Sequence, residues 1–153
     1  MKITDFLDVG RIIPDLKGKD KKAVLKELAD SLSARDRSLN GEILFETLLE
    51  REKISSTAIG EGVAIPHGKT SGNRKVSGIF ARSLEGVNFD SLDGGPTHLF
   101  FVLLAPEDSA ADHLKALARI SRLLKDGAFR ARLMERKTAQ ELFDVIKEED
   151  EKF

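Results

Sequence analysis

The sequence contains no cysteine among its 153 residues. Disulfide bonds, thiolate catalysis and a cysteine-ligated zinc site are therefore excluded. An excess of basic residues is also missing, because 25 Lys and Arg stand against 26 Asp and Glu and give a formal net charge of −1. Nucleic-acid-binding domains normally combine a high pI with a basic patch, so we do not expect a nucleic-acid partner.

Long hydrophobic runs are absent as well. The most apolar segment, 99–105, is much shorter than the about 20 residues that a membrane-spanning helix needs. The polar start of the chain does not resemble a signal peptide. We therefore predict a cytoplasmic protein without membrane insertion. Because the composition, with 41% hydrophobic residues, shows no break typical of a linker, one domain is expected over 1–153.

Apolar residues at helical spacing indicate several helices. The first two are predicted over 20–34 and 40–51, and three more are predicted to begin near 109, 129 and 138. Asn40 is expected to cap the second helix. Capping-box patterns that start at Ser109 and Thr138 mark two of the later helices.

Strands are predicted at 76–82 and 99–105, with a short turn-and-strand element at 86–89. Segment 99–105 is apolar at every position, as expected for a strand buried on both faces. Between 54 and 72 the periodicity disappears, and we predict a structured loop with short extended pieces such as 63–65. The strand at 99–105, buried on both faces, needs helices on both sides of its sheet. The predicted fold class is α/β, a three-layer α/β/α sandwich with a central mixed β-sheet.

Histidine is the natural side chain for chemistry near neutral pH, and the chain contains three. His67 follows Pro66, which restricts the backbone at itself and at Ile65, and precedes Gly68, which allows the chain to turn. This arrangement predicts an imidazole presented at a rigid corner. The local pattern is equally consistent with a surface histidine that has no function.

Two further residues are candidates to bind an anion. His113 is expected in the first turn of its helix, where the helix dipole favours phosphate; an exposed or cap-associated histidine is the alternative. Arg51 lies near the end of the second helix, where it can complement the helix dipole or clamp a phosphate. His98, before the apolar strand, is interpreted as structural.

Other kinds of site are not favoured by the motifs. The glycines at 60 and 62 are followed neither by Gly-Lys-Ser/Thr nor by the third glycine of a dinucleotide fingerprint. Their loop can still direct backbone N–H groups at an oxyanion. No HExxH-type spacing and no Gly-x-Ser-x-Gly nucleophile elbow is present. We therefore expect no metal and no cofactor.

Segment 51–68, with the sequence REKISSTAIGEGVAIPHG, resembles the signature of a known family. This family is the enzyme IIA domain, fructose/mannitol class, of the bacterial phosphoenolpyruvate-dependent phosphotransferase system. A second match is LLAP at 103–106 followed by DHL at 112–114. The resemblance covers nearly the whole chain, and within the class it is greatest to the stand-alone nitrogen-regulatory enzyme IIA.

The resemblance implies that His67 accepts a phosphoryl group from a phosphohistidine on an HPr-like carrier protein. His113 is then the second active-centre histidine, and Arg51 is the group that stabilises the phosphate. A neutral imidazole is a competent nucleophile, and phosphoryl transfer depends mostly on positioning and charge stabilisation. The nucleophilicity of imidazole and the requirements of phosphoryl transfer both agree with this assignment.

The matching loop supplies the remaining candidates. Ser56, Thr57 and Gly68 are predicted to contact the phosphoryl group. The family usually has glycine where this chain has Ala58. Because alanine tolerates positive φ poorly, a slightly rearranged loop is expected there.

Two functions agree with the resemblance. The first is a regulatory phosphocarrier whose phosphorylation state is read by target proteins. The second is a sugar-transport enzyme IIA that passes the group to an enzyme IIB. The first is favoured by the nitrogen-type resemblance and because no IIB or membrane IIC segment is present. A binding module with a degenerate site and a metal-dependent hydrolase are the remaining alternatives.

Overall fold

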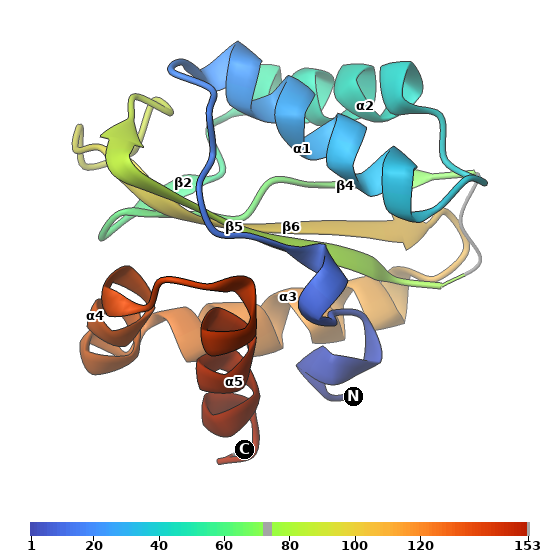
Figure 1. The fold of residues 1–153 in the computed structure, drawn as a ribbon. Helices are drawn as coiled ribbons and strands as arrows, with labels where there is room; N and C mark the ends of the chain where they lie inside the picture. The colour runs from blue at the N-terminus through green and yellow to red at the C-terminus, as the bar shows by residue number, and fades with distance from the viewer. Residues whose placement is uncertain (72–74, 153) are drawn as a thin grey trace.

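A mixed sheet lies between two helical layers in the computed structural model, which describes residues 1–71 and 75–152 (Figure 1). Helices α1 (Lys21–Arg35) and α2 (Gly41–Ile54) cover one face of the sheet. The other face is covered by α3 (Ala110–Leu124), α4 (Gly127–Glu135) and α5 (Ala139–Asp150). The predicted three-layer α/β/α sandwich is confirmed. No helix in the described part of the chain is long and apolar enough to cross a bilayer.

Six strands form the sheet that the structure describes, in the order β1-β5-β6-β3-β2, with β4 also pairing with β6. Their bounds are β1 (Ile12–Ile13), β2 (Ala58–Gly60), β3 (Val63–Ala64), β4 (His67–Thr70), β5 (Ser77–Val87) and β6 (Thr97–Pro106). Two 3₁₀ turns, η1 (Ile3–Asp5) and η2 (Val9–Arg11), precede β1. Strands β5 and β6 are antiparallel, whereas β3 and β4 run parallel to β6. The sheet is therefore mixed, as predicted.

Strand β6 lies at the centre of the sheet and contributes to two hydrophobic cores. Because side chains alternate between the two faces of a strand, alternate residues from Leu99 to Ala105 pack with α3, α4 and α5. The intervening Phe100, Val102 and Leu104 pack with α1 and α2. All of these side chains are buried, which confirms a strand buried on both faces.

The helix caps agree with the sequence in two of three places. Asn40 accepts the N–H groups of Glu42 and Ile43, and Thr138 accepts the N–H of Glu141. Ser109 occupies the N-cap position of α3, but its side chain accepts no capping hydrogen bond from the described residues. Helix α3 begins where the sequence predicted it, but the capping box expected at Ser109 does not form, since its ψ of 49° is not the extended conformation that a capping side chain normally requires.

The region predicted as a loop with short extended pieces over 54–72 contains β2, β3 and β4. Strand β3 agrees with the extended piece expected at 63–65, whereas β2 and β4 were not located; position 72 lies outside the described residues. These strands have two to four residues each, too few to produce a recognisable alternation. Strand β5 is also longer than predicted. It joins the expected elements at 76–82 and 86–89 into one strand, with a register shift between Arg82 and Val87.

Candidate functional site

His67 is the first residue of β4, where pairing with β6 fixes its backbone opposite Leu103. Its Nδ1 atom lies 2.8 Å from the carbonyl oxygen of Ile65. Because a carbonyl oxygen only accepts hydrogen bonds, Nδ1 must carry the proton and donate. The other ring nitrogen, Nε2, therefore keeps its lone pair. The half-buried ring is held in one tautomer by its own backbone.

The chain does not turn after His67, contrary to the prediction. Residues 67–70 are extended, and the described glycines with positive φ are Gly60, Gly62, Gly86 and Gly94, not Gly68. Glycine at 68 serves packing instead. A Cβ atom there would lie 2.8 Å from Cγ2 of Thr47, so its absence lets α2 approach β4.

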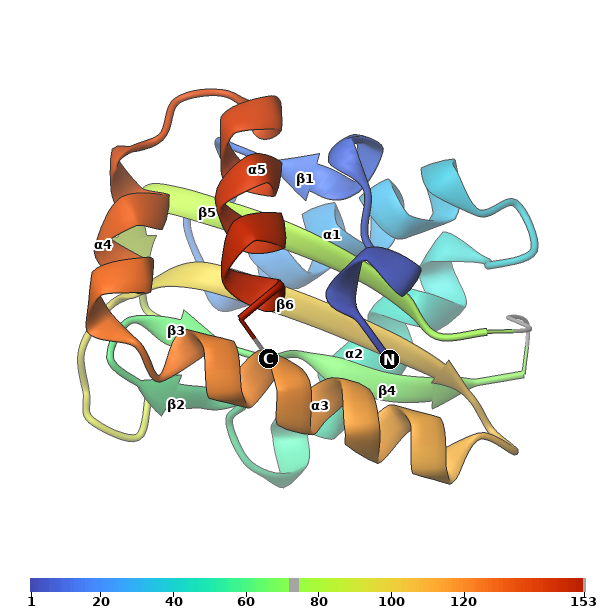
Figure 2. The same ribbon diagram turned by 90° about the horizontal axis from the view of Figure 1, so that it is seen from below.

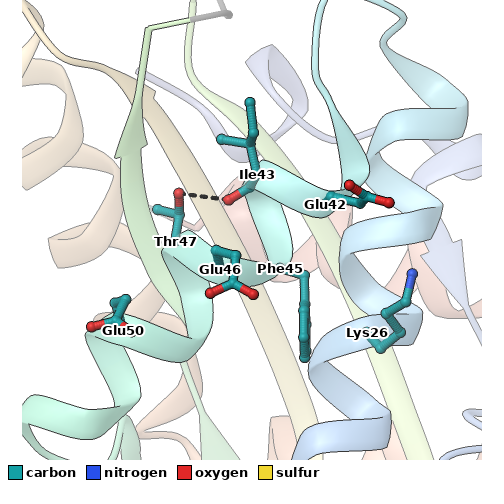
Figure 3. Close-up of a pocket in the computed structure, with 7 residues that line it drawn as sticks. All are labelled: Lys26, Glu42, Ile43, Phe45, Glu46, Thr47 and Glu50. Atoms are coloured by element: carbon teal, nitrogen blue, oxygen red, sulfur yellow. Dashed lines mark hydrogen bonds between the residues drawn. The ribbon is translucent and has the colours of Figure 1, made fainter.

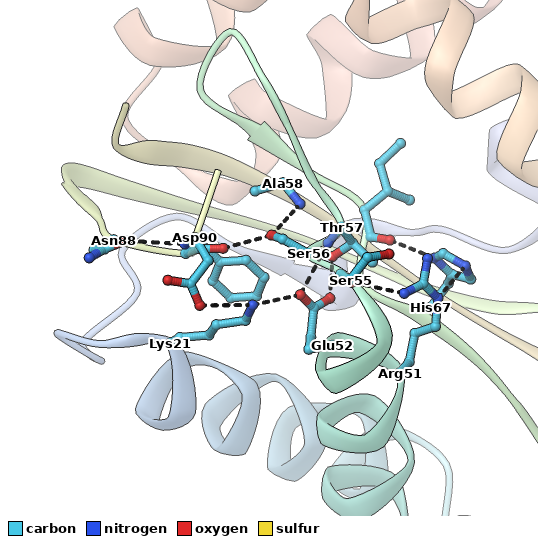
Figure 4. Close-up of polar contacts among 12 residues, drawn as sticks. Lys21, Arg51, Glu52, Ser55, Ser56, Thr57, Ala58, His67, Asn88 and Asp90 are labelled. Carbon is cyan, nitrogen blue, oxygen red and sulfur yellow. Dashed lines mark hydrogen bonds and ion pairs between the residues drawn. The ribbon is translucent and has the colours of Figure 1, made fainter. Parts of the chain in front are cut away.

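Arg51 lies in the last turn of α2 and reaches the histidine (Figure 4). Its Nε–H donates to Nε2 of His67 at 3.4 Å, and its Nη1 donates to the carbonyl oxygen of Ser55 at 2.9 Å. Two bonds from one planar guanidinium fix the orientation of that plane. The structure thus brings Arg51 to the nitrogen of His67 that has the lone pair.

His113 comes from the opposite helical layer, from the first turns of α3, which runs along β4 in Figure 2. The centroids of the His67 and His113 rings are 5.5 Å apart. His113 is only 6% exposed, and its Nδ1 has no hydrogen-bond partner among the described residues. Burial lowers the pKa of His113 below its usual value, and the nearby His67 and Lys69 lower it further. The exposed histidine considered as an alternative is excluded, and a neutral ring is favoured near pH 7.

The hydroxyl groups of Ser56 and Thr57 face protein groups. Ser56 donates to the carbonyl oxygen of Phe89 at 2.8 Å, and Thr57 donates to the Glu52 carboxylate. In Figure 4 these bonds lie on the side of the loop away from the imidazole. The structure therefore brings His67, His113 and Arg51 together but does not bring these two hydroxyls to them.

Ala58 requires no rearrangement of the loop. It is a fully buried residue of β2, and the described non-glycine residues with positive φ are Glu61 and Asp90. An extended strand accepts alanine without strain, so the expectation of an altered loop was wrong. His98 has a structural environment, since its Nδ1 lies 2.9 Å from the carbonyl oxygen of Ser83.

Two charged residues beside the site were missed from the sequence. Glu52 is buried and lies 2.9 Å from Nζ of Lys21, at the start of α1. Lys21 belongs to a strongly basic segment, 17–22, which by composition favours exposure to solvent, but its side chain is only 19% exposed. A signal for Glu52 was present, because it continues the buried stripe of Leu44 and Leu48 at intervals of four residues.

A pocket of about 650 Å³ lies on the outer side of α1 and α2 (Figure 3). The residues that line it are Lys26, Glu42, Ile43, Phe45, Glu46, Thr47 and Glu50. None of the predicted site residues is among them. Three carboxylates and one ammonium group make its wall acidic, which is unfavourable for a phosphate.

Residues 5–149 match the model of the family described as phosphoenolpyruvate-dependent sugar phosphotransferase system, EIIA 2. The chain belongs to this family. The EIIA 2 model spans both helical layers and includes His67, His113 and Arg51. The expected phosphotransferase-system component is confirmed.

The relatives of this EIIA 2 chain include nitrogen regulatory proteins. The chain is 47% identical over 146 residues to the nitrogen regulatory protein of Bradyrhizobium diazoefficiens, and the match covers 95% of each. It is similar to the crystal structure of nitrogen regulatory protein IIA-Ntr from Neisseria meningitidis, with a TM-score of 0.88, 36% identity and coverage of 94% and 98%. These matches support the nitrogen type over a sugar-specific enzyme IIA.

A more distant structure shares the fold. It is the Escherichia coli complex of enzyme IIAMTL and phosphorylated enzyme IIBMTL, with a TM-score of 0.77 and 22% identity. The likeness covers 92% of this chain and 96% of that one.

Proposed function

We propose that this protein carries a phosphoryl group on Nε2 of His67, which it accepts in the cytoplasm from an HPr-like phosphocarrier. The observation that carries the proposal is the bond from Nδ1 to the carbonyl oxygen of Ile65. This bond leaves the lone pair on Nε2, the nitrogen that faces Arg51. A neutral imidazole of this kind is a competent nucleophile toward phosphorus.

The transfer proceeds between two histidines. The Nε2 lone pair of His67 forms the new N–P bond while the bond to the donor histidine breaks and its electron pair returns to the donor ring. The Nδ1 proton of His67 stays on the ring, and the carbonyl oxygen of Ile65 stabilises the positive charge that the ring acquires.

Charge on the transferred group is stabilised from both helical layers. The positive Arg51 guanidinium stabilises the phosphoryl group from α2, and a neutral His113 donates a ring N–H to it from α3. Donors that are in place before reaction stabilise developing negative charge without reorganisation. The predicted contact of Ser56 and Thr57 with phosphate would need a change in their present hydrogen bonds.

Regulation through target proteins is the role that we propose for the phosphorylated state. A dianionic group on one face changes which partners bind, and the 47% identical relative is named a nitrogen regulatory protein. The second candidate, transfer to an enzyme IIB, is supported by the shared fold of the mannitol enzyme IIA that forms such a complex. Transfer from the phosphorylated protein to isolated IIB components distinguishes the two.

The central experiment incubates the protein with phosphoenolpyruvate, enzyme I and an HPr-type carrier and measures its intact mass. We expect an acid-labile gain of one phosphoryl group. It should be lost in His67→Ala and kept in His98→Gln, a control at a histidine outside the site. No gain with an active cognate donor, or an unchanged gain in His67→Ala, would contradict the proposal.

A further inference from the structure

A buried carboxylate lies directly behind the loop that leaves α2. Glu52 is 6% exposed and accepts the Thr57 N–H at 3.1 Å and the Thr57 hydroxyl. A carboxylate with two bonds to one residue holds that residue at a defined position. Because a buried charge is costly unless it is paired, the Lys21 ammonium at 2.9 Å makes this arrangement stable.

The hydrogen bonds continue from Thr57 to the imidazole. The Thr57 carbonyl oxygen accepts the N–H of Ile65 at 3.1 Å. The carbonyl oxygen of Ile65 accepts the Nδ1 proton of His67 at 2.8 Å. Three consecutive contacts, the last of which selects the tautomer of His67, therefore connect the Glu52 carboxylate to the imidazole.

The same carboxylate also affects Arg51. Glu52 closes the turn from the end of α2 to Thr57, and the carbonyl oxygen that holds Nη1 of Arg51 belongs to Ser55 within that turn. In Figure 4 Glu52 lies between Lys21 on one side and Arg51 with His67 on the other. One side chain thus supports both groups that surround the Nε2 lone pair.

Lys21, the cation that pairs with Glu52, also contacts a further segment of the chain. Lys21 begins α1, and its Nζ also lies 3.3 Å from the Asp90 carboxylate and 4.8 Å from the centre of the Phe89 ring. The start of α1, the exit of α2 and the turn after β5 meet at this point. Because Lys21 contacts both other segments, displacement of the start of α1 would break its contacts with each of them.

We infer that Glu52, held by Lys21, is a positioning residue for phosphoryl transfer, acting through Thr57 on the imidazole of His67 and on the Arg51 guanidinium. The inference rests on the proposed function of His67. Glu52 contacts neither His67 nor the transferred group. Its effect is therefore expected on the maximal rate and on the tautomer of His67, and not on affinity for the phosphocarrier.

The test compares Glu52→Gln and Thr57→Val with a matched control. Glu27→Gln is the control because Glu27 of α1 also tethers a loop, accepting the N–H groups of Lys17 and Gly18, yet these bonds do not lead to the site. Single-turnover transfer from a phosphorylated HPr-type carrier is measured over a range of carrier concentrations. Ring ¹⁵N shifts of His67 report its tautomer in the unphosphorylated protein.

We expect the maximal transfer rate to fall about 10- to 100-fold in Glu52→Gln and less in Thr57→Val, since small displacements of reacting groups have effects of this size. The half-saturating carrier concentration should not change. The Nδ1–H tautomer should lose population in Glu52→Gln alone or in both variants, and Glu27→Gln should behave as wild type. Rates and tautomer equal to those of Glu27→Gln would overturn the inference.

Failure of the proposed function gives a different result. If the wild type accepts no phosphoryl group, the role of His67 as carrier is wrong, while the ring shifts still decide the positioning role. A shifted tautomer in Glu52→Gln then shows that Glu52 positions the imidazole although the ring carries no phosphoryl group, and an unchanged one overturns the positioning role as well.

Discussion

Two buried carboxylates, Glu52 and Asp150, lie in opposite helical layers and make similar contacts. Glu52 accepts the N–H of Thr57 and faces Lys21, and Asp150 accepts the N–H of Ile3 at 2.9 Å and faces Arg119. Each carboxylate therefore joins one backbone N–H and one cation inside the protein.

The two carboxylates differ in what they hold. The contacts of Asp150 connect the end of α5 to η1 and to α3, through Ile3 and Arg119 and not through His67 or Arg51. The contacts of Glu52 continue through Thr57 to His67. The comparison shows that the same buried pair can maintain the fold in one place and the geometry of a site in another, depending on the segment it fixes.

The largest effect on stability is expected at Asp150. Asp150→Ala removes a carboxylate that is 1% exposed and leaves Arg119 and the Ile3 N–H without it. Removing one partner of a buried pair costs about 3–5 kcal/mol, and urea unfolding measures this loss. At a temperature where the variant is folded, its phosphoryl transfer should match the wild type. A transfer defect as large as that of Glu52→Gln would remove the contrast between the two carboxylates.

Arg51→Lys tests the geometry at the site itself, on the Glu52 side of the comparison. Lysine keeps the positive charge but lacks the planar guanidinium, which donates to His67 and to the Ser55 carbonyl oxygen at the same time. We expect transfer to slow about tenfold, equivalent to about 1.4 kcal/mol of transition-state stabilisation. The single-turnover rate measures it, and Lys53→Arg, in an exposed ion pair of the same helix turn, is the control. Equal rates in Arg51→Lys and wild type would show that charge alone is sufficient.

His113 extends the comparison to a buried group whose Nδ1 has no partner among the described residues. Burial lowers its folded-state pKa below 6.5, so the unfolded chain binds more protons just below that pH. Stability should therefore fall as pH decreases through 6.5 toward the folded-state pKa, by less than about 1.4 kcal/mol per pH unit. Urea unfolding between about pH 7.5 and about pH 5.5 should show a smaller decrease for His113→Gln. An identical decrease would assign the effect to other groups.

The smallest effect is expected at an exposed pair. Lys26 and Asp30 of α1 are 2.9 Å apart, with side chains 50% and 57% exposed. Exposed pairs contribute about 0–1 kcal/mol, so Lys26→Ala should change the unfolding free energy by less than about 1 kcal/mol. A larger change in urea unfolding would mean that burial is not what distinguishes Glu52 and Asp150 from surface charges.

The sequence predicted the long elements better than the short ones. Helices α1 and α2 and strand β6 have enough residues to show a period, and their predicted ranges agree with the structure. Strands β2, β3 and β4 are too short for this, and β4 carries His67. Strand β2 pairs with the neighbouring β3, and β3 and β4 are extended because they pair with β6, which is distant in the sequence.

Local reasoning was least successful for residues with two compatible uses. Gly68 is suited to a turn and to close packing, and only the approach of Thr47 decides for packing. The hydroxyl of Thr57 is suited to a phosphate and to a carboxylate, and the buried Glu52 is the partner that is present. Thr47 lies outside segment 51–68, and Glu52, although within it, meets Thr57 because its side chain is buried behind the loop.

The sequence by itself determined the three layers, the family resemblance and the choice of His67, because hydrophobic periodicity and a continuous motif are local properties. Only the tertiary structure decided that His113 is buried beside His67 and that Nε2 carries the lone pair. It also decided that Lys21 supports Glu52 behind the site. These features arise from contacts between α1, α2, β4 and α3, which meet only when the sheet has formed.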